Sequence, residues 1–385
     1  MLANYYNSNN YINNYSNSNI ISEVGGVKNK IKNKSKYKSI NRYKPTKKNK
    51  TFKKNKNINK YKHRYNSHKN TYVKNRPVLY TQTNAITPMN CSPAVKGKSV
   101  LENSCLTPDI LLKIKNKYNE DHSSNPIISK DPREIWTELN NRLSAEGCKQ
   151  EDCWLKELDD DTLRKQIDKY IFAPDMPKEW LTNPDEWLSN FDIANVLEQY
   201  EKTYPSFKFM GPTTMDFDTR LKEKGGQCVE EEICKFDLKT DMKKGFKQFA
   251  CVVNLDKHWQ SGSHWVSLFV DVPEQVIFYF DSAGCSSTPT EIIDLVDRIK
   301  DQGKYLKNPV EFEFLTNGNH DHQRGNTECG MYSIFFIITM LTGKTPFHKD
   351  KILTMQERTD LFLAKRIPDK VIFDYRELYF NKPNE

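Results

Sequence analysis

The sequence predicts an α+β fold in which helices flank a mixed β-sheet, and three observations support this class. Apolar residues recur at helical spacing in several segments of residues 107–204. Runs of β-branched and aromatic residues, separated by polar loops, follow over residues 248–316. The loop 316–328 then leads into an almost entirely apolar helix that opens at Cys329. We therefore expect this last helix to pack against the sheet.

Charge divides the 385 residues into two unequal parts. Residues 1–101 contain 22 lysines and arginines and a single acid, Glu23, whereas residues 102–385 contain 37 basic and 49 acidic residues. A chain of this length has room for two domains with real cores. The expected parts are a disordered, Asn/Lys-rich basic tail and linker (1–102), a small helical domain (103–185) and a larger domain (186–385).

The basic tail has two interpretations. Residues 1–20 are mostly Asn, Tyr and Ser, and residues 28–76 are dominated by Lys and Asn. Neither stretch has enough apolar side chains to offset the entropy of ordering its backbone. The tail could be no more than a solvated segment. Alternatively, its lysines could neutralise the phosphates of a nucleic acid or another polyanion while its tyrosines stack on bases, and such binding would be lost at high salt.

Four helices are expected before the first strand. The segment "TPDILLKIKNKY" (107–118) begins with threonine and carries an apolar stripe, and "SKDPREIWTELNNRL" (129–143) has a proline in its first turn. The segment "DDTLRKQIDKYIF" (160–172) completes the helical domain. After a break, "FDIANVLEQYEKTY" (191–204) supplies the first helix of the larger domain.

The sheet is expected from four runs. The first three are "QFACVVNL", "HWVSLFVDV" and "QVIFYFD". The connection between the second and third is short enough for a hairpin that uses Pro273 and Glu274. A helical segment, "TPTEIIDLVDRIK", precedes the fourth run, "VEFEFLT". These elements give the larger domain both strands and covering helices.

The nine cysteines and the N-terminal sequence set expectations about compartment and metals. No CxxC pair occurs, and the first 19 residues lack the charged start and apolar stretch of a signal peptide. We therefore expect a reducing interior with free thiols. The spacings of Cys148/Cys153 and Cys228/Cys234 fit no common zinc module, so neither a metal nor another cofactor is expected. The longest apolar run, around residues 334–341, is too short for a transmembrane segment, which takes about 20 residues.

Cys329 stands where a thiol can be activated. A free thiol is only slightly ionised at neutral pH, and the N–H groups at a helix N-terminus favour its thiolate. Thr327 could cap this helix. A nearby imidazole, held by an acceptor of its own, would complete the activation. Because a buried cysteine at a helix start is more often structural than catalytic, the identity of the base decides the interpretation.

Among the histidines, His264 is best placed to act as this base. It follows a glycine turn and opens a predicted strand, while Asp281 ends the neighbouring strand. The two side chains can therefore form an oriented base at adjacent strand ends. Gln323, six residues before Cys329, could donate its amide to a developing oxyanion together with the backbone N–H of Cys329.

The remaining histidines near these motifs have less specific interpretations. His258 lies in the loop ahead of the strand and could line the cleft. His320 and His322 flank Asp321 and could bind a metal ion, but loop histidines beside a cleft are usually solvated. Cys285 follows "FDSAG" and is expected to be a bystander near the site.

The motifs "GSHWVSLFVD", "FYFDSAG" and "HQRGNTECGMYSIFFI" resemble the adenain-like, papain-like cysteine proteases. This family includes the SUMO-specific proteases, the adenovirus protease and the polyprotein-processing protease of African swine fever virus, to which the likeness is closest. The resemblance implies a nucleophile at Cys329, a base at His264, its orienting partner at Asp281 and an oxyanion donor at Gln323. The swine fever enzyme has Asn where this chain has Asp281, so this position is more similar to the SUMO-specific proteases.

The resemblance also implies cleavage after Gly-Gly, because a narrow cleft roofed by aromatic side chains admits only residues without side chains. Trp265 could form this roof or simply fill the core. The leading prediction is a viral thiol endopeptidase that cleaves precursor proteins at Gly-Gly-X sites during virion maturation, in the virion and at assembly sites in the host cytoplasm. One alternative is removal of SUMO or ubiquitin-like proteins. The other is an inactive scaffold of this fold that binds nucleic acid.

Overall fold

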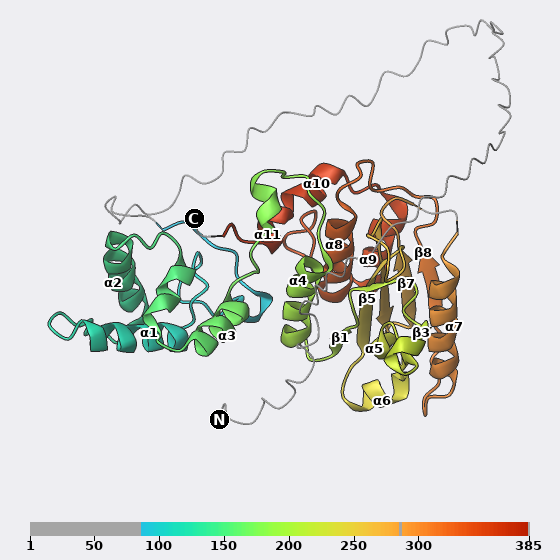
Figure 1. The fold of residues 1–385 in the computed structure, drawn as a ribbon, viewed down its shortest axis with the longest axis horizontal. Coiled ribbons are helices and arrows are strands. Elements are labelled where there is room, and N and C mark those ends of the chain that lie inside the picture. The colour runs from blue at the N-terminus through green and yellow to red at the C-terminus, as the bar shows by residue number, and fades with distance from the viewer. Residues whose placement is uncertain (1–85, 285–286, 384–385) are drawn as a thin grey trace, which may run out of the picture. The chain divides into compact units, whose positions relative to one another are not determined.

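The computed structural model describes residues 86–284 and 287–383 (Figure 1). The predicted basic tail lies almost entirely outside these residues. Before the sheet the chain forms η1 (Pro93–Val95), α1 (Pro108–Asp121), α2 (Pro132–Ala145), η2 (Glu151–Glu157), α3 (Asp161–Ile171) and η3 (Lys178–Leu181). The carboxylates of Asp131 and Asp160 accept hydrogen bonds from the first backbone N–H groups of α2 and α3, which fixes where these two helices begin.

The helices α1, α2 and α3 share a hydrophobic core. Leu111 of α1, Leu139 of α2 and Trp154 of η2 are fully buried in it. Val95, which belongs to the segment that we expected to be linker, is fully buried in the same core. Residues 86–102 thus have ordered structure, because contacts with the helices supply the burial that their own composition lacks.

A mixed sheet follows the helix α4 (Asn190–Thr203). Its strands are β1 (Phe207–Phe209), β2 (Thr213–Thr214), β5 (Gln248–Asn254), β6 (Trp265–Asp271), β7 (Val276–Phe280) and β8 (Glu313–Thr316). The strand order is β1-β5-β6-β7-β8, and β2 also pairs with β5. The pairs β5–β6 and β6–β7 are antiparallel, whereas β1–β5, β2–β5 and β7–β8 are parallel. The predicted α+β class with a mixed sheet is confirmed.

Smaller elements and helices complete this part of the chain. They are β3 (Arg220–Leu221), η4 (Lys222–Lys224), β4 (Gln227–Cys228), α5 (Glu231–Cys234), α6 (Leu238–Lys243), α7 (Thr290–Lys304), α8 (Cys329–Thr342), α9 (Met355–Ala364), α10 (Asp369–Asp374) and α11 (Arg376–Tyr379). The strands β3 and β4 form a separate antiparallel pair.

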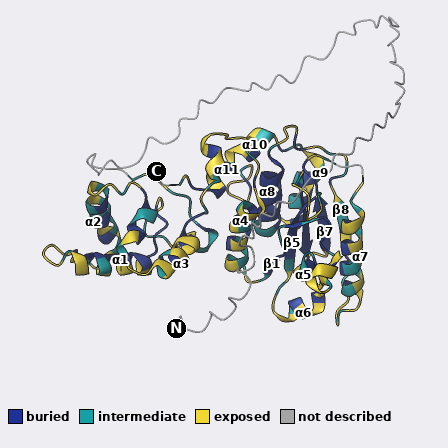
Figure 2. Cartoon of the chain, viewed as in Figure 1, coloured by how far each residue is buried: buried dark blue, intermediate teal, exposed yellow. Residues whose placement is uncertain are grey.

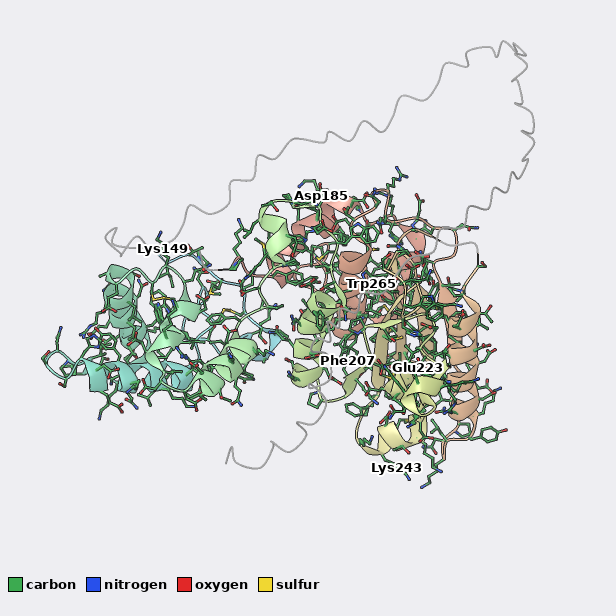
Figure 3. The ribbon with its side chains drawn as sticks, in the orientation of Figure 1. Lys149, Asp185, Phe207, Glu223, Lys243 and Trp265 are labelled. Atoms are coloured by element: carbon green, nitrogen blue, oxygen red, sulfur yellow. A yellow bond between two sulfur atoms is a disulfide. The ribbon has the colours of Figure 1, made fainter. Side chains whose placement is uncertain are left out.

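Both faces of the sheet are covered, as the dark strands in Figure 2 show. Successive side chains of a strand point to opposite faces. On one face, Phe207 and Trp265, both labelled in Figure 3, pack with the side chains of α4 and α8. On the other face, Leu268 and Val270 pack with α7. Two-sided burial explains why the strand sequences are almost continuously apolar.

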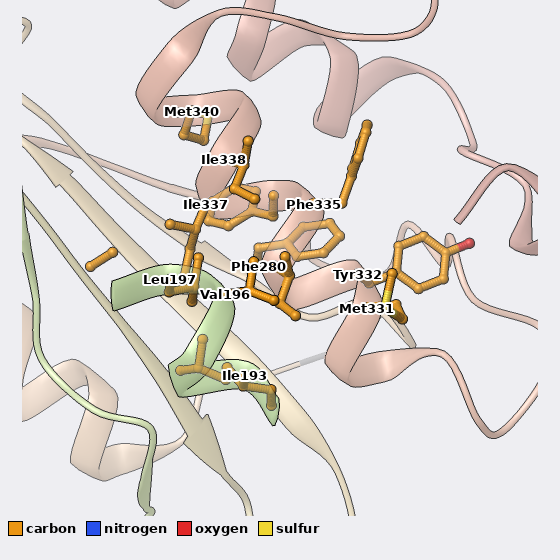
Figure 4. Close-up of a cluster of buried hydrophobic side chains, with 14 of the residues drawn as sticks. Ile193, Val196, Leu197, Phe280, Met331, Tyr332, Phe335, Ile337, Ile338 and Met340 are labelled. Atoms are coloured by element: carbon orange, nitrogen blue, oxygen red, sulfur yellow. The ribbon is translucent and has the colours of Figure 1, made fainter. Parts of the chain in front are cut away.

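The helix α8 is buried on nearly all sides. From Cys329 to Met340, every residue is buried. Its side chains meet Phe280 of β7 and the apolar face of α4 (Figure 4). A helix that is apolar all round is expected at the centre of a core. This burial fixes the position of the residue that opens α8, which is Cys329.

The structure overturns the expectation of free thiols for six cysteines. Disulfides join Cys91 to Cys105, Cys148 to Cys153 and Cys228 to Cys234. Folding brings the Cα atoms of these pairs to 5.2, 5.6 and 6.4 Å, which lies within disulfide reach. Sequence spacing does not reveal such approach. Among the described residues, the free cysteines are Cys251 and Cys329.

Over residues 86–284 and 287–383, the structure contains no helix that is both long and apolar enough to cross a membrane.

Candidate active site

Three elements bring the predicted site residues to one edge of the sheet. His264 immediately precedes β6, and Asp281 immediately follows β7. Because β6 and β7 are antiparallel, with Ser267 opposite Phe280, the start of one strand lies beside the end of the other. The helix α8 packs on β6 and presents Cys329 at its first position.

His264 is held between Asp281 and Cys329. Its Nε2 lies 2.7 Å from Oδ1 of Asp281, and its ring also forms a hydrogen bond with the side chain of Cys329. Since Nε2 is engaged by Asp281, Nδ1 is the ring nitrogen left to face the thiol. Burial lowers the pKa of His264, but the hydrogen bonds and charges of Asp281 and Cys329 outweigh this effect and raise it to about 10. The arrangement therefore favours an imidazolium at His264, beside Cys329.

Asn317 fixes the backbone of Asp281, and sequence reasoning did not find it. Its Oδ1 accepts from the backbone N–H of Asp281 at 3.0 Å, and its Nδ2 donates to the carbonyls of Asp281 and His320 at 2.7 and 2.9 Å. Asn317 directly follows β8, which is parallel to β7, so the two strands end side by side. The sequence signal that could have revealed Asn317 is a polar residue at the end of a predicted strand.

Ser282 orients the amide of Gln323. The Ser282 hydroxyl donates to Oε1 of Gln323 at 2.8 Å, and the Ser282 carbonyl accepts from the backbone N–H of Gln323 at 2.7 Å. Nε2 of Gln323 donates to the carbonyl of Gly325 at 3.1 Å. Because the carbonyl of Gly325 can only accept, the NH₂ group of Gln323 is assigned to the side that faces Gly325 and the oxygen to the side that faces Ser282. Gln323 is thus tied to the residue next to Asp281.

The start of α8 differs from the expectation in one respect. Glu328, not Thr327, is the N-cap residue, and its side chain makes no capping hydrogen bond. The first N–H groups of a helix have no acceptor within the helix. The backbone N–H of Cys329 is at this position, which agrees with its predicted role as an oxyanion donor.

Trp265 fills the core and also lines a pocket. Its side chain is 8% exposed, and Nε1 donates to the carbonyl of Leu188 at 3.1 Å. The pocket has a volume of about 380 Å³, and its lining includes Trp187, Pro212, Asn254, Gly262 and Trp265. Two of these residues, Gly262 and Trp265, flank His264 in the sequence. Trp265 therefore belongs to the core, and its role as the roof of the cleft stays a prediction.

Gly330 allows α8 to approach this pocket wall closely. A Cβ atom at Gly330 would lie 3.1 Å from Cβ of Leu188 and 3.5 Å from Cδ1 of Trp265. Any larger residue would push α8 away from the wall. The glycine after Cys329 thus sets the separation between the nucleophile helix and the pocket.

Two further histidines of the described residues take structural positions. His322 is fully buried, not solvated: Nδ1 accepts from the backbone N–H of Ile367, and Nε2 donates to the carbonyl of Phe362. Burial of the ring lowers the pKa of His322 to about 4, so it is neutral near pH 7. His258 pairs with Asp216 at 2.7 Å. Within the described residues, no three His, Cys, Asp or Glu side chains are grouped to hold a metal ion.

Comparison with known proteins identifies the class of enzyme. Residues 235–371, which include His264, Asp281, Gln323 and Cys329, match the Ulp1 protease family, C-terminal catalytic domain. A protein of Acanthamoeba polyphaga mimivirus that is named as a thiol protease is 27% identical over 320 residues, which are 77% of this chain and 94% of the relative. The protein is a cysteine protease.

A second relative supports this assignment, and a solved structure supports the fold. A SUMO-1 cysteine protease of African swine fever virus is 29% identical over 294 residues, 70% of this protease and 98% of the relative. The crystal structure of an African swine fever virus protease matches with a TM-score of 0.50 and 23% identity, over 78% of this chain and 98% of that one. The predicted resemblance and the predicted fold are confirmed.

We expect Ser282→Ala to lower kcat by about 10- to 100-fold through misorientation of Gln323. Gln323→Ala should lower kcat further, by about 10²- to 10³-fold, because it removes the predicted oxyanion donor outright. If Ser282 acts through Gln323, the double variant will be no slower than Gln323→Ala alone. The measurement is kcat of the four proteins on one peptide. Additive losses would show that Ser282 acts independently of Gln323.

Proposed function

We propose that this protease cleaves precursor proteins after Gly-Gly during virion maturation. Its homologues include viral cysteine proteases. The observation that carries the proposal is the pocket whose lining includes Trp187 and Trp265, because Trp265 directly follows His264 in the sequence. A narrow site between aromatic rings favours residues without side chains and lets their backbone approach the thiolate.

The chemistry is assigned to the residues already described. Cys329 thiolate attacks the carbonyl carbon of the second glycine, and the developing oxyanion is stabilised by the N–H of Cys329 and the amide of Gln323. His264 gives its proton to the leaving amine, which departs as the new N-terminus. Water, deprotonated by His264, then hydrolyses the thioester. Asp281 keeps the imidazole of His264 in the same orientation during both steps.

A peptide panel tests the specificity. Wild type should cleave Gly-Gly-X peptides, and replacing either glycine by alanine should lower kcat/KM by roughly 10- to 200-fold, the usual discrimination for one methyl group. Cys329→Ala run in parallel identifies cleavage by a contaminant. Equal cleavage of Gly-Gly and Ala-Ala peptides would refute a glycine-selective site.

Trp187→Ala should relax this selectivity. Trp187 is 39% exposed, so its removal widens the pocket without opening the core. We expect KM to rise and the preference for glycine over alanine to fall below about threefold. Trp259→Ala is the matched control, since Trp259 is 65% exposed and lies in the nearby β5–β6 loop. Unchanged selectivity in Trp187→Ala would remove this residue from the specificity site.

Removal of SUMO or ubiquitin-like proteins is the second candidate function. One relative is named a SUMO-1 cysteine protease, and Asp281 rather than Asn pairs with His264 here. Whole SUMO and ubiquitin fusions, assayed beside the short peptides, separate the two functions. Cleavage of folded fusions alone would favour tag removal. If neither is cut, the inactive nucleic-acid-binding scaffold would become the leading interpretation.

The basic tail remains a proposed anchor for nucleic acid or another polyanion, although it lies outside the described residues. Binding should weaken steeply between low and physiological salt and should disappear on deletion of residues 1–85. Gly25-Gly26 in "EVGGVK" is in addition a candidate self-cleavage site. An intact N-terminus after long incubation of active enzyme would contradict self-cleavage. We further propose that the protease acts in the virion and at host assembly sites.

A further inference from the structure

Arg376 is a buried arginine, and it is not one of the catalytic residues described above. It opens α11 and lies beyond the residues that match the protease family. Only 4% of the residue is exposed. Its Nε donates to Oε2 of Glu328 at 3.1 Å and its Nη2 to Oε1 at 2.8 Å. The guanidinium thus donates to both oxygens of the carboxylate. This bidentate geometry is the one in which arginine binds carboxylates most strongly.

The same guanidinium holds a second segment. Nη1 donates to the carbonyl of Pro184 and, at 3.3 Å, to the carbonyl of Glu186. The guanidinium carbon also lies 4.2 Å from the ring centre of Trp180. Arg376 therefore connects residues 180–186 to Glu328, two parts of the chain that are far apart in sequence.

Both connected segments adjoin the active site. Glu328 directly precedes Cys329, and residues 184–186 lead into Trp187 and Leu188, which line the pocket. The carbonyl of Leu188 accepts from Trp265, and Leu188 also contacts Gly330 of α8. Arg376 thus links the residue that precedes Cys329 to the segment that leads into the pocket wall.

Arg376 also directs the Glu328 carboxylate away from the helix. At the N-cap position a carboxylate commonly accepts from the first N–H groups of the helix, yet Glu328 makes no such bond. Such a bond would place the carboxylate at the N–H groups of Gly330 or Met331, close to the N–H of Cys329. The negative charge of Glu328, if not neutralised by Arg376, would also lie directly beside the sulfur that attacks the substrate.

We propose that Arg376 is a positioning residue for proteolysis. It neutralises Glu328 beside the nucleophile, keeps the N-terminus of α8 open, and fixes residues 184–186 of the pocket wall. The contact with Glu328 and the contacts with Pro184 and Glu186 predict separable effects. Loss of the Glu328 contact impairs the reactivity of Cys329, whereas loss of the Pro184 and Glu186 contacts impairs substrate binding.

Arg376→Met tests both effects. Alkylation of Cys329 by iodoacetamide, followed by peptide mass spectrometry, measures reactivity without any substrate and so does not depend on the proposed Gly-Gly specificity. Kinetics on a Gly-Gly-X peptide measure kcat and KM. We expect slower alkylation, a raised KM and a kcat/KM lower by about 10²-fold.

The double variant Arg376→Met/Glu328→Gln separates the two contacts. Because glutamine replaces the unpaired carboxylate of Glu328, the rate of Cys329 alkylation should recover towards that of wild type. KM should stay raised, because the carbonyls of Pro184 and Glu186 still lack their donor. A role in folding alone would not divide in this way.

Arg298→Met is the matched control. Two nitrogens of Arg298 also donate to a carboxylate, that of Asp218, at 2.9 and 3.3 Å. Arg298 donates in addition to the carbonyl of Ile233. It belongs to α7, on the opposite face of the sheet from α8. Circular dichroism confirms folding at the assay temperature. Its alkylation rate and KM should match those of wild type.

Two results would overturn the proposal. One is an Arg376→Met enzyme with the alkylation rate and KM of wild type. The other is an equal loss in the Arg376 and Arg298 variants. If Arg376→Met fails to fold, the double variant still decides, because a wild-type KM in that protein also contradicts the proposal.

Discussion

Replacing Cys329 by alanine should lower kcat/KM by at least about 10⁴-fold, the largest effect expected of any single substitution in this protease. Cys329 is the thiol that opens α8 and shares a hydrogen bond with His264. Alanine removes the proposed nucleophile but changes little volume, so the fold should be retained. The measurement is peptide cleavage with the variant at high enzyme concentration.

Cys251 supplies the matched control for this substitution. It is the other free cysteine of the described residues, fully buried in β5, and burial raises the pKa of its thiol to about 12. A thiol so far from ionisation at neutral pH cannot act as nucleophile. Cys251→Ala should therefore keep the rate of wild type. Activity that survives in Cys329→Ala but disappears in Cys285→Ala would move the nucleophile to Cys285, which lies outside the described residues.

The sequence was informative where local patterns determine structure. The helix that opens at Cys329 is evident from its apolar run, and the strands from their β-branched and aromatic residues. The contact between His264 and Asp281 could also be predicted, since antiparallel neighbours bring the start of one strand to the end of the next. Only one turn separates these two strands, so the contact is nearly local.

Contacts between distant segments could not be predicted in this way. Asn317 binds the backbone of Asp281 across 36 positions, and Arg376 reaches Pro184 across 192. His322 illustrates the same limit, because its loop sequence suggests solvent while α9 and the segment after it enclose the ring. Hydrophobic periodicity records which face of an element is buried, but not which polar group meets it there.

Asp281→Ala is expected to have the second-largest effect, a loss of about 10³- to 10⁴-fold in kcat/KM at neutral pH. Oδ1 of Asp281 also accepts from the backbone N–H of Ala283 at 2.9 Å, so the carboxylate is fixed before it meets His264. Alanine removes both the orientation of the imidazole and the stabilisation of its charge. Asp281→Asn keeps an acceptor oxygen for Nε2–H and should lose less activity.

The pH profile of Asp281→Asn separates charge from orientation. Burial lowers the pKa of His264, whereas Asp281 and Cys329 raise it, with a net value of about 10. The imidazolium that protonates the leaving amine thus persists up to about pH 10, and kcat/KM of wild type should fall above that pH. Removal of the Asp281 charge weakens one cause of the raised pKa. The ring then loses its proton at a lower pH, and the alkaline limb should move in that direction.

Asp216→Asn is the control for this shift, because Asp216 pairs with His258 at the same 2.7 Å as Asp281 does with His264. The alkaline limb of the kcat/KM profile of Asp216→Asn should coincide with that of wild type, since His258 carries no proton used in the reaction. If Asp281→Asn also keeps the wild-type limb, the charge of Asp281 does not hold the proton on His264. The thiolate of Cys329 would then be the group that stabilises the imidazolium, and Asp281 would serve orientation alone.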